Sequence, residues 1–294
     1  MKHLRKDFPA LMLDDPVAYL DNACVTLKPQ SVIDSIQDYY INTPGCGGRS
    51  VHRYGTHVSK SISQSRKKLA NFFSAPSVNE IVFTRNATHS LNQIAKGLEW
   101  NKGDVVLTTD REHNSNLVPW LQLEQEQGID HRVVRSNQDN TFNLESFEEA
   151  CAEAGTKLKM VSMSHVGNLD GVETPVKEIT KIAKDYGALV SIDGAQSAPH
   201  MSVDVQDLGI DFYSFSIHKM LGPSGLGGLW ARTELLENMR TIQSGGQTVT
   251  TATYESFEWA KAPSKFEGGL GHFAGMMATG AAVDYLTELN MDDV

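Results

Sequence analysis

The chain has 294 residues, of which 40% are hydrophobic and 21% charged, and its formal net charge is −10. This length suffices for one large α/β domain or two smaller ones, and the acidic balance argues against a surface that binds nucleic acid or anionic membranes. No apolar run approaches membrane-spanning length, and the N-terminus lacks the apolar stretch of a signal peptide.

The three cysteines, Cys24, Cys46 and Cys151, lie far apart and form no C-x-x-C pair. An odd number without such a pair favours a reducing compartment over a disulfide framework or a structural zinc site. We therefore expect a soluble cytoplasmic protein that holds no metal and binds neither nucleic acid nor membrane.

In chain order, apolar spacing and breaker residues predict alternating helices and strands. Residues 1–20 are expected to form an N-terminal arm, and helices are predicted over 29–40, 59–73, 87–100, 144–154 and 176–186. Strands are predicted over 80–84, 102–109, 129–134, 158–164, 188–192 and 211–216. This rhythm is typical of an α/β fold with a mainly parallel sheet and helices on both faces.

Polar side chains follow several of these strands. They are Thr88, His113, Asn168, Asp193, Gln196, Ser216, His218 and Lys219. Ligands collect at the carboxyl ends of the strands in parallel sheets, so this edge of the sheet is the predicted site.

Lys219 stands where a buried strand ends, in Ser216-Ile217-His218-Lys219 before a glycine-rich turn. A lone lysine at a strand end is usually a surface residue, but a lysine held in this context can form a Schiff base with a carbonyl. Asp193 precedes it by 219 − 193 = 26 residues, which predicts neighbouring strands. An amine and a carboxylate so placed suit pyridoxal 5′-phosphate, whose ring nitrogen needs an acidic partner.

A strand–turn–helix at Ala87-Thr88-His89-Ser90 offers free N–H groups and a positive dipole end, which suit a phosphate. Alone this signal is weak, because a hydroxyl residue at a helix start is usually just a cap.

Seven segments together resemble the class V aminotransferase family of fold-type I pyridoxal-phosphate enzymes, most closely its cysteine desulfurase and selenocysteine lyase branch. They are Tyr19-Leu20-Asp21-Asn22-Ala23, Val51-His52-Arg53, Arg85-Asn86-Ala87-Thr88, Glu112 to Trp120, Ile192-Asp193-Gly194-Ala195-Gln196, Ser216 to Lys219, and Phe266-Glu267-Gly268-Gly269. The resemblance implies a seven-stranded, mainly parallel sheet, with a large cofactor-binding domain over 21–265 and the start of an incomplete small C-terminal domain over 266–294. It also implies a homodimer with active sites at the subunit interface.

The resemblance further implies a role for each residue. Lys219 would hold the cofactor as a Schiff base and move protons, Asp193 would pair with the ring nitrogen, and His113 would stack on the ring and assist proton transfer. Gln196 would bond the phenolic oxygen and Asn168 would approach the ring and the substrate carboxylate, while Ala87, Thr88, Ser216 and His218 would hold the phosphate.

The sequence departs from the family pattern in two places. The family's nucleophilic cysteine and its carboxylate-binding arginine lie beyond the position that matches Val294, and Leu270-Gly271-His272 replaces a Thr-Pro that usually follows the Phe-Glu-Gly-Gly segment. Cys24 or Cys46 could supply a thiolate instead, since both border the expected pocket, whereas Cys151 is expected to be structural.

We therefore expect a pyridoxal-phosphate enzyme that cleaves the Cβ–S or Cβ–Se bond of a small amino acid and passes sulfur to an acceptor protein. Two alternatives stay open. One is a kynureninase-like or epimerase-like reaction that needs no nucleophilic cysteine, and the other is a catalytically idle cofactor-binding protein or sulfur-carrier scaffold.

Overall fold

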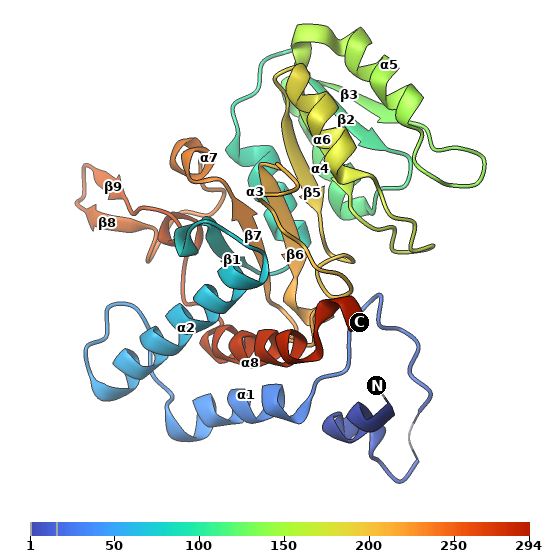
Figure 1. Cartoon of the computed structure of the whole chain (residues 1–294). Coiled ribbons are helices and arrows are strands. Elements are labelled where there is room, and N and C mark those ends of the chain that lie inside the picture. Colours follow the sequence, from blue (N-terminus) through green and yellow to red (C-terminus); the bar gives the residue numbers. More distant parts are fainter. Residues whose placement is uncertain (1, 16) are drawn as a thin grey trace.

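A mixed, mainly parallel sheet organises the protein, whose computed structural model describes residues 2–15 and 17–294 (Figure 1). The described strands of this sheet follow the order β1-β7-β6-β5-β4-β2-β3, in which β1, β7 and β6 pair antiparallel and the remaining pairs are parallel. The strands are β1 (Ile81–Thr84), β2 (Val105–Thr109), β3 (Asp130–Val134), β4 (Leu158–Ser164), β5 (Leu189–Asp193), β6 (Phe212–Ser216) and β7 (Gly227–Ala231).

Helices cover both faces of the sheet, as the sequence predicts. The helices are α1 (Gln30–Asn42), α2 (Arg53–Phe72), α3 (Ala87–Gly97), α4 (Asn114–Gln127), α5 (Leu144–Ala154), α6 (Val176–Asp185), α7 (Thr233–Asn238) and α8 (Phe273–Leu289). Buried side chains of α3, α4 and α7 form one core with one face of the sheet, and those of α2, α5, α6 and α8 form a second core with the other face. The predicted α/β fold class is confirmed.

The two cores arise from the alternation of side chains along each strand. In β1, Val82 belongs to the core with α3, whereas Ile81 and Phe83 belong to the core on the opposite face. Both faces are apolar, so β6 and β7 are buried along their whole length and β4 is buried except at Lys159 and Ser164, as expected for a sheet covered on both sides.

The ends of the chain meet beside α8 (Figure 1). The first residues form the short 3-10 helices Lys2–Asp7 and Pro9–Leu11. Tyr285 of α8 donates a hydrogen bond to Asp7 Oδ2 at 3.0 Å and packs edge-on against Phe8. Met1 and Pro16 of the expected N-terminal arm lie outside the described residues, and the division at 21–265 and 266–294 stays a prediction.

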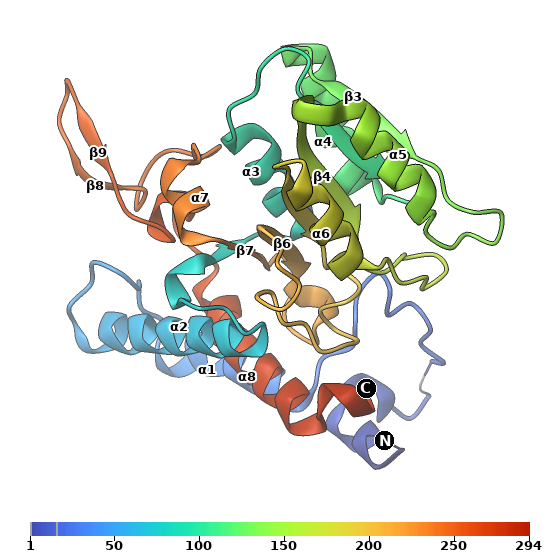
Figure 2. The same ribbon diagram turned by 45° about the horizontal axis from the view of Figure 1, so that its top comes forward.

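A two-stranded hairpin of β8 (Val249–Ala252) and β9 (Phe257–Trp259) projects away from the sheet (Figures 1 and 2). Its aromatic side chains are exposed, including Tyr254 in the connecting turn and Phe257 on β9.

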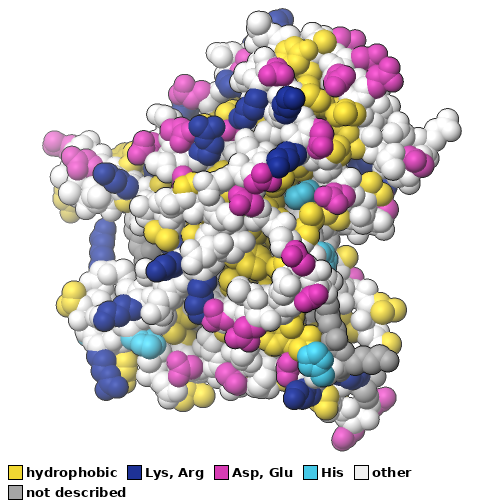
Figure 3. Space-filling view, viewed as in Figure 1, with side chains coloured by type: hydrophobic (Ala, Val, Ile, Leu, Met, Phe, Trp, Pro, Cys, Tyr) yellow, Lys and Arg dark blue, Asp and Glu magenta, His cyan; other side chains and the backbone are white. Residues whose placement is uncertain are grey.

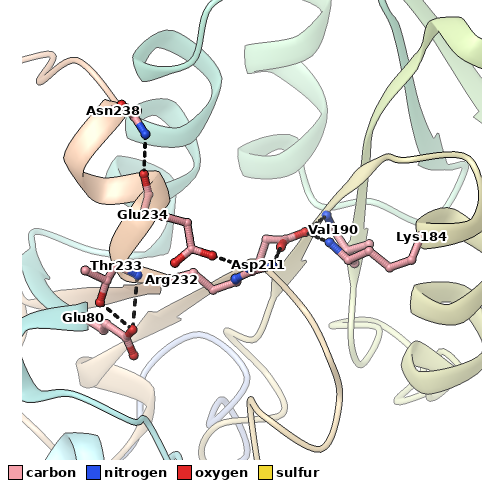
Figure 4. Close-up of polar contacts among 8 residues, drawn as sticks. All are labelled: Glu80, Lys184, Val190, Asp211, Arg232, Thr233, Glu234 and Asn238. Atoms are coloured by element: carbon pink, nitrogen blue, oxygen red, sulfur yellow. Dashed lines mark hydrogen bonds and ion pairs between the residues drawn. The ribbon is translucent and has the colours of Figure 1, made fainter.

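Two buried carboxylates, Asp211 and Glu80, hold the strands together at the ends opposite to those that carry Asp193 and Lys219. Figure 4 shows the polar contacts of both carboxylates. Asp211, which has no exposed surface, accepts hydrogen bonds from the Val190 N–H at 2.7 Å and Arg232 Nη1 at 2.9 Å, and it pairs with Lys184. Glu80 accepts bonds from Trp230 Nε1 and from the N–H and hydroxyl of Thr233. These bonds fix β5, β6 and β7 relative to one another at their far ends.

The surface charge is mixed. On the face shown in Figure 3, Lys and Arg side chains are interspersed with Asp and Glu rather than gathered into one basic area. Within the described residues, no helix combines the length and the hydropathy needed to span a membrane.

Candidate active site

A cavity of about 510 Å³ opens where β4, β5 and β6 end, and all nine residues singled out in the sequence line it. They are Ala87, Thr88, His113, Asn168, Asp193, Gln196, Ser216, His218 and Lys219. The volume lies within the range of about 300–1,000 Å³ that is common for small-molecule sites. The structure thus brings the predicted residues together, while the individual role of each stays a prediction.

Asp193 and Lys219 reach the cavity from neighbouring parallel strands. Asp193 is the last residue of β5 and lies in register with Ser164 of β4 and Ser214 of β6. Lys219 ends a short 3-10 helix, Ile217–Lys219, that directly follows β6. The sequence spacing of 26 residues predicts this arrangement, and the structure agrees with it.

Each of the two groups is shifted by its surroundings. Burial raises the pKa of Asp193, opposed by the hydrogen bond from the Ala195 N–H (3.0 Å) and by the charges of Lys219 and His113. Burial lowers the pKa of Lys219, and the nearby Asp193 carboxylate opposes this effect. A lysine whose pKa is lowered presents more free amine, which is the nucleophilic form.

The glycine after Asp193 leaves room for the ring of Tyr213 on β6. A Cβ added to Gly194 would lie 2.0 Å from the ring of Tyr213. Tyr213 is fully buried, and its hydroxyl shares a 2.7 Å hydrogen bond with the hydroxyl of Ser197.

We expect Gly194→Ala to lower the free energy of unfolding by about 1–3 kcal/mol, because the added methyl group overpacks a core position that cannot yield. Denaturant unfolding measures this loss. Gly246→Ala is the matched control, since an added Cβ at Gly246 meets no atom within 4 Å. Equal effects of the two substitutions would contradict the packing argument.

Helix α3 begins at the rim of the cavity, and its cap differs from the sequence expectation. The residue that caps it is Asn86, whose Oδ1 accepts the His89 N–H at 2.9 Å. Thr88 is therefore free of a capping duty, and its hydroxyl instead shares a 2.6 Å hydrogen bond with the Ser115 hydroxyl. The N–H of Ala87 donates to Ser216 Oγ at 3.0 Å, which joins the helix start to the end of β6.

His113 caps helix α4 with its own ring. Its Nδ1 accepts the Ser115 N–H at 3.1 Å, so in the neutral ring the proton belongs on Nε2. The Ser115 hydroxyl contacts the same nitrogen at 2.9 Å and thereby connects His113 to Thr88. Sequence reasoning overlooked Ser115, although its position two residues after a capping histidine was a usable signal.

A partly buried carboxylate supports the loop that carries His113. Glu112 accepts hydrogen bonds from Thr109 Oγ1 (2.7 Å), Asn116 Nδ2 (2.6 Å), and the N–H (3.1 Å) and hydroxyl (2.8 Å) of Ser164. Burial raises the pKa of Glu112, and these bonds oppose that effect. Glu112 thus joins the ends of β2 and β4 to the first turn of α4.

The cysteines are placed differently. Cys24 lines the cavity, and Cys46 is exposed on the glycine-rich loop, where its Sγ contacts the Gly47 carbonyl at 3.4 Å. Cys151 is fully buried in the core, and burial raises its pKa to about 12. Its predicted structural role agrees with this position.

Comparison with known proteins decides the family. The profile of the family described as "Aminotransferase class-V" matches residues 18–294. The chain belongs to this family. A probable cysteine desulfurase of Halalkalibacterium halodurans is 38% identical over 99% of the chain and 72% of the relative, and a cysteine desulfurase of Salmonella newport is 35% identical over 100% and 73%.

Solved structures agree with the sequence relatives. The apo structure of a cysteine desulfurase from Thermococcus onnurineus superimposes with a TM-score of 0.93 at 33% identity, covering 99% of this chain and 72% of that one. The cysteine desulfurase CsdA of Escherichia coli gives 0.91 at 32% identity, with 99% and 73% covered. The predictions of the family and of a cysteine desulfurase-like enzyme are confirmed, and the chain spans a little under three quarters of these relatives.

Proposed function

We propose that the protein is a pyridoxal-phosphate enzyme that cleaves the Cβ–S or Cβ–Se bond of cysteine or selenocysteine. The observation that carries the proposal is the amine of Lys219 and the carboxylate of Asp193 on neighbouring strand ends of one cavity. One solved relative at 25% identity is a C-DES mutant with glycine covalently linked to its PLP cofactor, over 97% of this chain and 74% of that one with a TM-score of 0.85.

The residues at the site fit this cofactor. Lys219 supplies an amine, Asp193 a buried carboxylate, and the start of α3 a helix dipole and backbone N–H groups suited to a phosphate. Among the described residues, none accepts the N–H of Thr88, so that donor is available. When bound, pyridoxal phosphate supplies an aldehyde that bonds to amines and a ring that accepts electrons.

Each residue has a task in this proposal. Lys219 would hold the cofactor and carry a proton on Nζ to and from the substrate, and the Asp193 carboxylate would be the acidic partner of the ring nitrogen. His113 would stack on the ring, Gln196 would bond the ring oxygen, and Asn168 would approach the substrate. The remaining four residues hold the phosphate; they are Ala87, Thr88, Ser216 and His218.

Incubation with cysteine and, separately, with alanine tests the proposal. Sulfide release from cysteine is the expected result. A change in cofactor absorbance without sulfide would favour the kynureninase-like or epimerase-like alternative, and a protein that binds no cofactor would be the idle scaffold. A homodimer, a sulfur-acceptor protein and a cytoplasmic location belong to the same proposal.

The same assay tests whether Cys24 or Cys46 acts as the nucleophile. Because Cys24 lines the cavity with Lys219, Cys24→Ser is the informative variant and Cys46→Ser its control. Loss of sulfide release in Cys24→Ser alone would make Cys24 the nucleophile, and unchanged release would exclude it from that role.

We expect Asp193→Asn to lower turnover by at least about a hundredfold, the cost of removing a group that stabilises developing charge. The fold is retained, because the Asn side-chain oxygen can still accept the Ala195 N–H. Steady-state kinetics together with a thermal melt measures both effects. Unchanged turnover would remove Asp193 from the mechanism.

A further inference from the structure

A second lysine binds the backbone directly before Lys219. Lys28 Nζ donates hydrogen bonds to the carbonyl oxygen of His218 at 2.8 Å and to that of Thr26 at 2.7 Å. The first of these bonds spans 190 positions of the sequence. Lys28 does not line the cavity described above, so it reaches the site only through the backbone.

The same carbonyl receives two further donors. The N–H and the hydroxyl of Thr26 donate to the His218 oxygen at 3.2 and 3.0 Å. The Thr26 hydroxyl oxygen in turn accepts the N–H of Leu221 at 3.1 Å. The segment from Thr26 to Lys28 therefore binds the backbone at His218 and at Leu221, on both sides of Lys219. Residues 218–222 form the gripped turn.

The gripped turn contains an uncommon backbone conformation. Leu221 has a φ of 61°, in the left-handed region that residues other than glycine rarely adopt. Such a conformation persists where surrounding contacts hold it in place. The contact from Leu221 to Thr26 is one of these.

The ammonium of Lys28 is partly buried, and its hydrogen-bond partners are oxygens of uncharged groups. Among the ion pairs between described residues, none includes Lys28. Burial lowers its pKa to about 8. The position of this cation thus costs stability, which is a common property of groups that serve a site.

We propose that Lys28 is a positioning residue for Lys219, whose ammonium fixes the His218 carbonyl and so aims the Lys219 amine into the cavity. The reaction of the Lys219 amine rests on the proposed function, whereas the hydrogen bonds from Lys28 to the gripped turn do not.

Amide hydrogen exchange of the cofactor-free protein tests the grip. In Lys28→Met we expect exchange at Met220, Leu221 and Gly222 to become at least about tenfold faster, because these N–H groups bond within the gripped turn or to Thr26. The melting temperature should change little, since the removal of a desolvated cation offsets the loss of its hydrogen bonds to the Thr26 and His218 carbonyls. Lys28→Arg should restore slow exchange, and Lys60→Met, an exposed lysine of α2, is the matched control.

Covalent capture of pyridoxal phosphate is the second readout. The Lys219 nitrogen bonds to the aldehyde carbon and the aldehyde oxygen leaves as water; borohydride reduction then fixes the product for mass spectrometry. We expect capture at Lys219 to be about tenfold slower in Lys28→Met and restored in Lys28→Arg.

Each outcome has a definite meaning. Exchange in Lys28→Met equal to that of the parent would overturn the positioning role, and so would a loss of capture that merely follows a lower melting temperature. If the parent captured no cofactor, the proposed function would fail, and the exchange experiment would still decide whether Lys28 holds the turn.

Discussion

Replacement of Lys219 by alanine is expected to abolish covalent retention of pyridoxal phosphate and to lower turnover by at least about 10⁴-fold, as for loss of a group that is both nucleophile and base. Lys219 is the one lysine among the described residues that line the cavity, so no neighbour can take its place. Borohydride reduction followed by mass spectrometry measures the retention, and single-turnover kinetics measures the rate.

We expect Lys219→Ala to lose activity without losing thermal stability. Burial lowers the pKa of Lys219, so the folded protein gains nothing from its charge, and alanine should leave the melting temperature within a small shift of the parent. Lys60→Ala is the control for loss of a lysine elsewhere. Cofactor that stays covalently attached to Lys219→Ala would show that a different amine carries it.

Glu112→Gln is expected to lower the free energy of unfolding by about 2–4 kcal/mol. Both carboxylate oxygens accept hydrogen bonds, four in all, and a carboxamide nitrogen in place of one oxygen cannot accept them. A carboxamide must turn its own N–H groups toward either the Asn116 amide or the Ser164 N–H. Asn116 cannot easily flip, since its oxygen already accepts from Ser162 Oγ at 2.6 Å. Denaturant unfolding of the cofactor-free protein measures the loss.

The same substitution should weaken cofactor binding, because Glu112 supports the loop that holds His113. Glu153→Gln on the exposed face of α5 is the matched control and should change neither quantity. A stable Glu112→Gln variant with normal cofactor affinity would show that the four-donor arrangement has little energetic weight.

Most of the fold follows from local pattern. The predicted boundaries of α5 (Leu144–Ala154) and β4 (Leu158–Ser164) agree with the structure, because a capping Asn143 starts the helix and an apolar run defines the strand. The antiparallel order of β1, β7 and β6 could not be predicted, since pairing between distant strands leaves little trace in a single sequence.

Two helices departed from expectation for physical reasons. Helix α2 begins at Arg53 rather than Ser59, where its first turn is polar and is capped by the ring of His52. Helix α4 was not predicted, because Pro119 lies inside it and its buried face includes the polar Asn116. In α2 a local cap extends the helix beyond its apolar pattern, and in α4 the pattern itself is weak.

The sequence predicts the site residues whose side chains stand at strand ends. It does not predict the residues that position them through hydrogen bonds. Lys219, Asp193 and His113 each follow a recognisable strand, whereas Lys28 and Glu112 act through hydrogen bonds that only the folded chain creates. No local pattern distinguishes such a lysine from one on the surface.

The hydrogen bonds between Thr26, Lys28 and His218 also concern how the protein is made. The amine-bearing turn is complete only when a segment synthesised early meets a strand that leaves the ribosome much later. We therefore expect that a growing chain cannot retain pyridoxal phosphate until β6 and the turn after it have left the ribosome. Binding of the cofactor would then mark a late step in the synthesis of the protein.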